Sequence, residues 1–208
     1  PSRFEVGALQ WPVPLQFEQP DGTVGYGYKD EVLIHADVRA SNRDVDDGEM
    51  WPLAADERRL ACEHECLPGR TTLQLSLPGS ISGTRLVDLI NAPRVEAWLP
   101  RLPLAAGSPL APFTLTVSRL SSSDFVLALT WRSVANNVQW FPAPATAAAA
   151  PVSSLHRAGR RTQIELSAPT GVTTSDLQVI GGVVAYTNAS GERQAVELSV
   201  AVNELSQP

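Results

Sequence analysis

Short runs of alternating apolar and polar residues, separated by prolines and glycines, constrain this chain more than any other feature. The 208 residues include 17 prolines and 14 glycines, spread along the whole length. Proline breaks a helix interior and glycine weakens it, so long helices are not expected. Alternation with a period of two is typical of strands that bury one face. The chain is therefore predicted to be all-β, with short strands joined by turns.

The first half combines strand-like runs with one short helical pattern. Residues 8–19 and 26–40 mix alternation with β-branched and aromatic residues, and the "PDGTVGYG" between them supplies turn residues. In "TTLQLSLP", Thr71, Leu73, Leu75 and Leu77 alternate with mostly polar neighbours, which predicts a half-buried strand. Within residues 85–103, Leu86, Leu89 and Ile90 have helical spacing until Pro93 interrupts it, so one or two short helical turns are expected.

The second half contains six strand-like runs at short spacing. They cover residues 113–120, 124–133, 138–144, 161–168, 177–188 and 193–202. Turn residues separate most of these runs, a pattern typical of a β-sandwich, and Trp140 and Phe141 are expected to fill its core. Residues 142–154 are rich in alanine, but three prolines bracket and interrupt them, so we expect an exposed loop there.

A stretch rich in proline and small residues, "LPLAAGSPLAP", separates the two halves and has the composition of a linker. A chain of 208 residues is long enough for two modest all-β domains. We therefore expect two β-sandwich domains in tandem. Residues 1–103 form the first, together with the short helical connector, and residues 104–208 form the second.

Charge and hydropathy exclude several classes of function. The net charge of −6 and the pI near 5.1 disfavour nucleic-acid binding, because an acidic surface repels phosphates. The sequence has no apolar run of roughly 20 residues that could span a bilayer, and its first residues lack the pattern of a secretion signal. The motifs of serine hydrolases, phosphate-binding loops and zinc proteases are also missing, and His35 and His156 each stand alone.

The two cysteines of the chain, Cys62 and Cys66, lie in "LACEHECLPGRTTLQLSLP". Residues four apart in an extended strand are separated by roughly 13 Å, too far for a disulfide, so a bond between them requires a turn or one helical coil. Such a bond closes a small loop and is poorly placed as a staple. A close pair at an exposed turn suits thiol–disulfide exchange, in which the second sulfur resolves the mixed disulfide. Spacing alone leaves a redox pair, a structural bridge and a metal site open.

The metal hypothesis depends on His64, which lies between the cysteines. Two thiolates and an imidazole suit a soft ion such as Cu(I) or zinc, but the sequence offers no second cluster that could supply a fourth ligand. The simpler interpretation of His64 is a solvated loop residue. Glu63 and Glu65 place negative charge beside the thiols, which should raise their pKa values and counts mildly against a very reactive thiolate.

The order of three motifs resembles a known family. A "WPVP" segment, then "GYGYKDE", then Cys-x-x-x-Cys-x-Pro ahead of an alternating strand is similar to the periplasmic N-terminal region of DsbD/ScsB-type thiol-disulfide reductases. The strong part of the resemblance covers residues 4–79, and residues 104–208 resemble the family's following β domain more loosely. Family members usually carry an aromatic-rich strand ahead of the point where this sequence starts.

The resemblance implies immunoglobulin-like domains and a periplasmic thiol-disulfide oxidoreductase that requires no cofactor. Electrons would pass from a membrane-embedded reductase domain to periplasmic thioredoxin-fold proteins. In this family pattern Cys62 and Cys66 are the redox pair, Cys66 attacks the partner disulfide and Cys62 resolves it, with Tyr26 and Tyr28 as aromatic neighbours. Relatives linked to copper tolerance keep a metal site at Cys62, His64 and Cys66 as the alternative, beside a structural module with a static disulfide.

Overall fold

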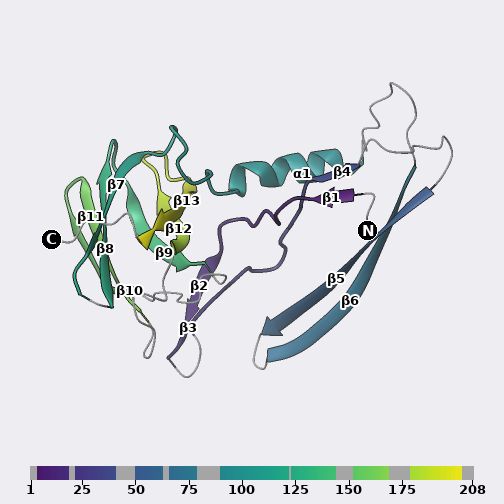
Figure 1. Cartoon of the computed structure of the whole chain (residues 1–208), viewed down its shortest axis with the longest axis horizontal. Coiled ribbons are helices and arrows are strands. Elements are labelled where there is room, and N and C mark those ends of the chain that lie inside the picture. Colours follow the sequence, from purple (N-terminus) through teal and green to yellow (C-terminus); the bar gives the residue numbers. More distant parts are fainter. Residues whose placement is uncertain are drawn as a thin grey trace. The chain divides into compact units, whose positions relative to one another are not determined.

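The computed structural model describes residues 4–18, 22–40, 50–62, 66–78, 90–121, 123–143, 152–168 and 179–202. Regular structure within these ranges is mostly β-strand, with one short α-helix (Figure 1). The expectation of an all-β chain is confirmed. Two compact units each combine two stretches of sequence, unit 1 from residues 1–8 and 37–90 and unit 2 from residues 9–36 and 91–208.

Unit 2 contains two antiparallel sheets that lie face to face (Figure 1). The four-stranded sheet has the order β10 (Val152–Ala158), β11 (Arg161–Ser167), β8 (Asp124–Trp131) and β7 (Phe113–Arg119). The three-stranded sheet has the order β13 (Arg193–Ala201), β12 (Val179–Thr187) and β9 (Asn136–Pro142). All six strand-like runs predicted in this half are therefore strands. The alternation of β11 is clear, since Thr162, Ile164 and Leu166 are all buried.

The seventh strand, β10, was not predicted. Its first residues, Val152 to Ser154, fall in the segment 142–154 that was expected to be an exposed loop. Pro142, at the other end of that segment, belongs to β9, and residues 144–151 lie outside the described part of the chain. β10 is an edge strand that pairs only with β11, and most of its side chains are exposed. Backbone pairing, rather than an apolar pattern, places it in the sheet.

One hydrophobic core fills the space between the two sheets of unit 2. The Trp131 ring lies at its centre, 4.9 Å from the ring of Phe113 and 4.9 Å from the ring of Tyr186. The indole Nε1–H of Trp131 donates a hydrogen bond to Oγ1 of buried Thr162 at 3.0 Å. Each large aromatic side chain buried in this way stabilises the fold by roughly 2–3 kcal/mol through apolar area alone.

A second, smaller cluster lies on the outer face of the three-stranded sheet. Successive residues of β9 point to opposite faces, so Trp140 enters the main core and Phe141 enters the second cluster. Both are nearly fully buried, but only Trp140 fills the sandwich core as predicted, since Phe141 packs in the second cluster. Val13 packs in the second cluster, and the Tyr26 ring contacts the Phe141 ring edge-on at 5.3 Å.

The segment that supplies Val13 and Tyr26 forms a hairpin that differs from the predicted one. Strands β2 (Leu15–Glu18) and β3 (Val24–Gly27) pair antiparallel, but β3 lies within residues 20–27, which were predicted to be the turn. Most of the predicted second strand, residues 26–40, is not a strand, and its last residues pair with β1 instead. Hydrogen bonds join this segment, residues 9–36, to the rest of unit 2. The Val13 N–H donates to the carbonyl of Arg101 at 3.1 Å, and the Arg193 guanidinium donates to the carbonyl of Pro14 at 2.8 Å.

The helical connector contains a short helix that includes Pro93. Helix α1 covers Ala92–Trp98 and continues into the 3₁₀ turn η1 (Leu99–Arg101). Pro93, expected to end a helix, lies in the first turn of α1, where its missing N–H costs nothing. The residues with helical spacing before Ile90 lie outside the described part of the chain.

Unit 1 contains two separate two-stranded sheets. Strands β1 (Phe4–Val6) and β4 (Val38–Ala40) form one, and β5 (Met50–Cys62) and β6 (Cys66–Pro78) form a long hairpin (Figure 1). The predicted strand at 71–78 is confirmed as part of β6. Its half-burial is wrong, since Leu73 and Leu75 are 59% and 58% exposed. A two-stranded sheet leaves both of its faces open, so no described side chain of the hairpin covers these two leucines.

Trp51 is the one buried hydrophobic residue among the described side chains of unit 1. A sandwich spanning residues 1–103 therefore stays a prediction. The domain boundary between residues 103 and 104 also stays a prediction, because a division into compact units does not establish which parts of the chain fold independently.

Candidate functional site

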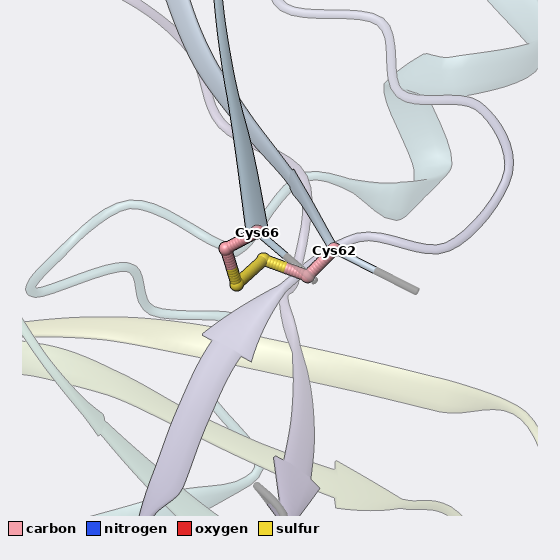
Figure 2. Close-up of a disulfide and its surroundings, with 2 residues drawn as sticks. All are labelled: Cys62 and Cys66. Atoms are coloured by element: carbon pink, nitrogen blue, oxygen red, sulfur yellow. A yellow bond between two sulfur atoms is a disulfide. The ribbon is translucent and has the colours of Figure 1, made fainter. Parts of the chain in front are cut away.

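A disulfide between Cys62 and Cys66 closes the end of the β5–β6 hairpin. Cys62 is the last residue of β5 and Cys66 the first of β6, and the two are direct partners in the register (Figure 2). Their Cα atoms are 4.1 Å apart. The chain therefore reverses its direction between Cys62 and Cys66, as the spacing requires, and the disulfide joins the facing ends of the two strands.

The disulfide is at the protein surface. Both cysteines are exposed, and so are the adjacent apolar side chains Leu60, at 63%, and Leu67, at 64%. In the main core of unit 2, by contrast, aromatic side chains are nearly fully buried. Because these residues are exposed, they leave the disulfide open to approach by a partner's sulfur along the line that exchange requires.

Side chains alternate between the two faces of the hairpin, so the register identifies the neighbours of the disulfide. The pair Leu60 and Pro68 follows on the same face, and the pair Arg58 and Arg70 comes next. Arg70 lies 3.8 Å from Asp56, whereas Arg58 makes no ion pair with any described residue. The surface beside the disulfide is thus apolar first and basic further along the strand.

The basic pair lies too far from the sulfurs to activate them strongly. Four residues of strand separate Arg58 from Cys62, which corresponds to roughly 13 Å. This exceeds the Debye length of about 8 Å at physiological salt, so the charge is largely screened at the sulfurs. Arg58 is better placed to contact an approaching acidic surface than to lower the pKa of a thiol.

The predicted metal ligands cannot be assembled from the described residues. His64, with Glu63 and Glu65, lies outside them, and no group of three or more His, Cys, Asp or Glu side chains that could hold a metal occurs within them. In the disulfide form both sulfurs are bonded to each other, so coordination would first require reduction. The metal site at Cys62, His64 and Cys66 stays a prediction.

Tyr26 and Tyr28 belong to unit 2, whereas both cysteines belong to unit 1. Tyr28 donates its hydroxyl hydrogen to the carbonyl of Pro12 at 2.8 Å, and burial raises the pKa of Tyr28. Tyr26 packs on Phe141. Both tyrosines therefore serve packing in their own unit, and their expected proximity to the cysteine pair stays a prediction.

A pocket of about 370 Å³ lies in unit 2, and no sequence motif predicted it. Its lining includes Tyr28 and Lys29, Trp98 and Arg101 from the end of the helical connector, and Arg193 from β13. No local motif joins these residues, because they lie in three distant stretches of sequence. Only "GYGYK" gave a partial signal, through its adjacent aromatic and basic residues.

No family model, curated protein or solved structure matches this chain. No helix within the described residues is both long enough and apolar enough to cross a membrane. The structure alone therefore describes the chain, as a β-rich protein with an exposed disulfide at the end of a two-stranded hairpin.

Proposed function

We propose that the chain is a thiol-disulfide oxidoreductase in which Cys62 and Cys66 exchange electrons with other proteins. The observation that carries this proposal is the exposure of both cysteines at the end of a hairpin. Exchange needs an accessible sulfur and a second sulfur held close to it. The register pairing of the two cysteines meets the second requirement.

The proposed cycle transfers two electrons to a partner disulfide. In the reduced form the Cys66 thiolate attacks one sulfur of the partner, which forms a mixed disulfide and releases the partner's other sulfur as a thiolate. The Cys62 thiolate then attacks Cys66, which re-forms the Cys62–Cys66 bond and releases the second partner thiolate. A dithiol reductant must afterwards reduce the Cys62–Cys66 bond, and its own two thiols become a disulfide.

The small loop favours this role over that of a staple. By the chain-entropy relation, a bridge between residues four apart stabilises a fold by about 2 kcal/mol, against about 3 kcal/mol for a 15-residue loop. The bond also joins strands that thirteen register pairs already hold together. A static bridge would therefore add little here, whereas a resolving sulfur opposite the attacking one speeds release of the partner.

The resemblance to DsbD/ScsB-type reductases supports the wider proposal. The proposed electron donor is a membrane-embedded reductase domain, the acceptors are periplasmic thioredoxin-fold proteins, and the proposed location is the periplasm. The proposed architecture is immunoglobulin-like, supported in unit 2 by two antiparallel sheets around one core. Leu60 and Pro68 would form the apolar part of the docking surface beside the disulfide.

Trapping of a mixed disulfide tests the proposal. Reduced Cys62→Ala protein, mixed with an oxidised thioredoxin-fold protein, should accumulate a covalent complex through Cys66 that dithiothreitol dissolves. The matched variant Cys66→Ala should accumulate much less, because the sulfur that attacks is missing. Equal and negligible trapping by both variants, with both folded, would contradict the proposal. Slow alkylation of the wild-type thiols after mild reduction would favour a static bridge instead.

A further inference from the structure

The pocket in unit 2 gathers positive charge in a chain that is acidic overall. Lys29, Arg101 and Arg193 line it, while the net charge of the chain is −6. Glu31 is the one acidic residue of the lining, and its carboxylate binds Arg94 at 3.0 Å. Within the described residues none of the three lining cations forms an ion pair with a carboxylate. The pocket therefore has a surplus of positive charge.

Arg193 is the most firmly positioned of the three cations. Its guanidinium donates to the carbonyl of Pro14 at 2.8 Å and to Oε1 of Gln139 at 3.1 Å, and both acceptors are neutral. Partial burial lowers the pKa of Arg193, which reflects the cost of desolvating its charge. The Phe141 ring is a further neutral partner, with its centroid 5.7 Å from the guanidinium carbon. A partly buried cation whose partners are all neutral gains from an anion that enters its site.

The remaining walls are apolar and aromatic. The guanidinium carbon of Arg101 lies over the ring of Trp98, 4.2 Å from its centroid, and both residues line the pocket. Val13 and Leu15 add aliphatic surface, and Tyr28 adds a second ring. A simple inorganic anion would leave these walls in contact with water, whereas a ligand with an apolar body would cover them.

The backbone at the rim is strained. The N–H of Glu31 donates to the carbonyl of Lys29 at 2.8 Å, and Asp30 between them has a φ of 63°. This three-residue turn with positive φ is the rare form of the γ-turn, which costs free energy for a residue other than glycine. The turn places Lys29 and Glu31 on the pocket while Asp30 is exposed outside its lining.

We propose that this pocket binds the carboxylate of an organic ligand with an apolar or aromatic body, the carboxylate lying among Lys29, Arg101 and Arg193. Such a carboxylate could come from a free acid or from the C-terminal residue of a peptide, and the pocket volume suits either. The proposal concerns unit 2 alone and does not depend on the cysteine pair.

Titration of the full chain with matched probes tests this site. 3-Phenylpropionate should bind saturably, and its neutral amide should bind at least about tenfold more weakly, since the charge-assisted hydrogen bonds are lost. N-acetyl-phenylalanyl-phenylalanine with a free C-terminus, compared with its C-terminal amide, shows whether a peptide carboxylate is preferred over the free acid. Chemical shifts of the Trp98 indole would report binding at the pocket itself.

Charge variants locate the site. Lys29→Gln and Arg101→Gln should each weaken 3-phenylpropionate binding several-fold, since each removes one cation from the lining. Arg161→Gln, at an exposed position of β11 outside the pocket, is the matched control and should leave binding unchanged. Equal binding of the acid and the amide, equal weakening by all three variants, or no saturation by millimolar 3-phenylpropionate would overturn the proposal. So would inorganic phosphate binding as tightly as the acid.

Discussion

Single contacts around Trp131 and Trp140 show what holds the core of unit 2 together. Trp131 carries a polar N–H into the core, and Thr162, itself fully buried, supplies the acceptor. Trp140 lies against Gly182, the residue of β12 that pairs with Pro142. One small residue matters at each tryptophan: Thr162 accepts the hydrogen bond from Trp131, and Gly182 leaves room for the ring of Trp140.

Thr162→Val should destabilise the chain by about 1–3 kcal/mol, because the Trp131 N–H loses its acceptor where no water replaces it. Valine keeps the shape and the strand preference of threonine, so the lost hydrogen bond dominates the effect. Thr130→Val, at an exposed position of β8, is the matched control and should change stability by less than about 0.5 kcal/mol. Urea unfolding measures both. Equal effects of the two variants would show that the Trp131–Thr162 bond contributes little.

Gly182→Ala should destabilise by about 1–3 kcal/mol or more, because a Cβ there would lie 2.4 Å from Cζ2 of Trp140 and 2.5 Å from the backbone oxygen of Phe141. The backbone oxygen cannot move aside cheaply. Gly27→Ala is the control, since its nearest neighbour would be the ring of Phe17 at an ordinary 3.8 Å. Thermal unfolding of both variants, with near-UV circular dichroism to follow tryptophan packing, compares them. Unchanged stability of Gly182→Ala would show that β9 can shift away from β12.

The turn between β7 and β8 is an element held by side-chain hydrogen bonds to one carboxylate. Asp124, at the start of β8, accepts from the hydroxyl of Ser121 at 2.5 Å and from that of Ser167 on β11 at 2.8 Å. The bonds from Ser121, then from Ser167, lower the pKa of Asp124 from its usual 3.8. A carboxylate with a lowered folded-state pKa stabilises the fold above its unfolded pKa, and this contribution is lost as the pH falls through the folded value.

Asp124→Asn should therefore lower stability at neutral pH, and the difference from wild type should shrink as the pH falls below about 4. Ser167→Ala removes one of the donors and should change the pH profile in the same direction but less. Urea midpoints between pH 7 and about pH 2 measure this. Parallel profiles for wild type and Asp124→Asn would show that Asp124 has the same pKa in the folded and unfolded chains.

At the scale of the whole molecule, patterns local in sequence predicted well and contacts distant in sequence did not. The six predicted strands of unit 2 each have a face that packs into the hydrophobic core, so their apolar pattern is visible in the sequence. β10 has no such face, since it is an exposed edge strand. The alternation of Leu73 and Leu75 predicted burial, but their hairpin pairs with no third strand among the described residues. Pairing partners, unlike periodicity, cannot be deduced from one segment.

The candidate sites follow the same rule. Cys62 and Cys66 are four residues apart, so spacing alone required the turn that the structure contains. Lys29, Arg101 and Arg193 line one pocket only because residues 9–36 pack on the rest of unit 2, and nothing in their local sequence indicates this. The role of His64 as a metal ligand and the domain boundary between residues 103 and 104 stay predictions.

The packing of residues 9–36 predicts how the chain behaves when it is cut at the proposed boundary. A fragment of residues 104–208 loses Val13 and Tyr26, which cover Phe141, and should unfold at a lower temperature than the same strands in the whole chain. Calorimetry of the fragment and the whole chain measures the shift. An unchanged unfolding temperature would show that residues 104–208 form a domain that needs no support from residues 9–36.

The reduction potential of the Cys62–Cys66 bond tests the central claim most directly. Equilibration of the whole chain with glutathione or dithiothreitol buffers, followed by alkylation and mass analysis, gives this potential. An exchange protein should lie within the range of known exchange catalysts, about −120 to −270 mV. A potential well below about −300 mV, typical of inert structural bridges, would contradict the account.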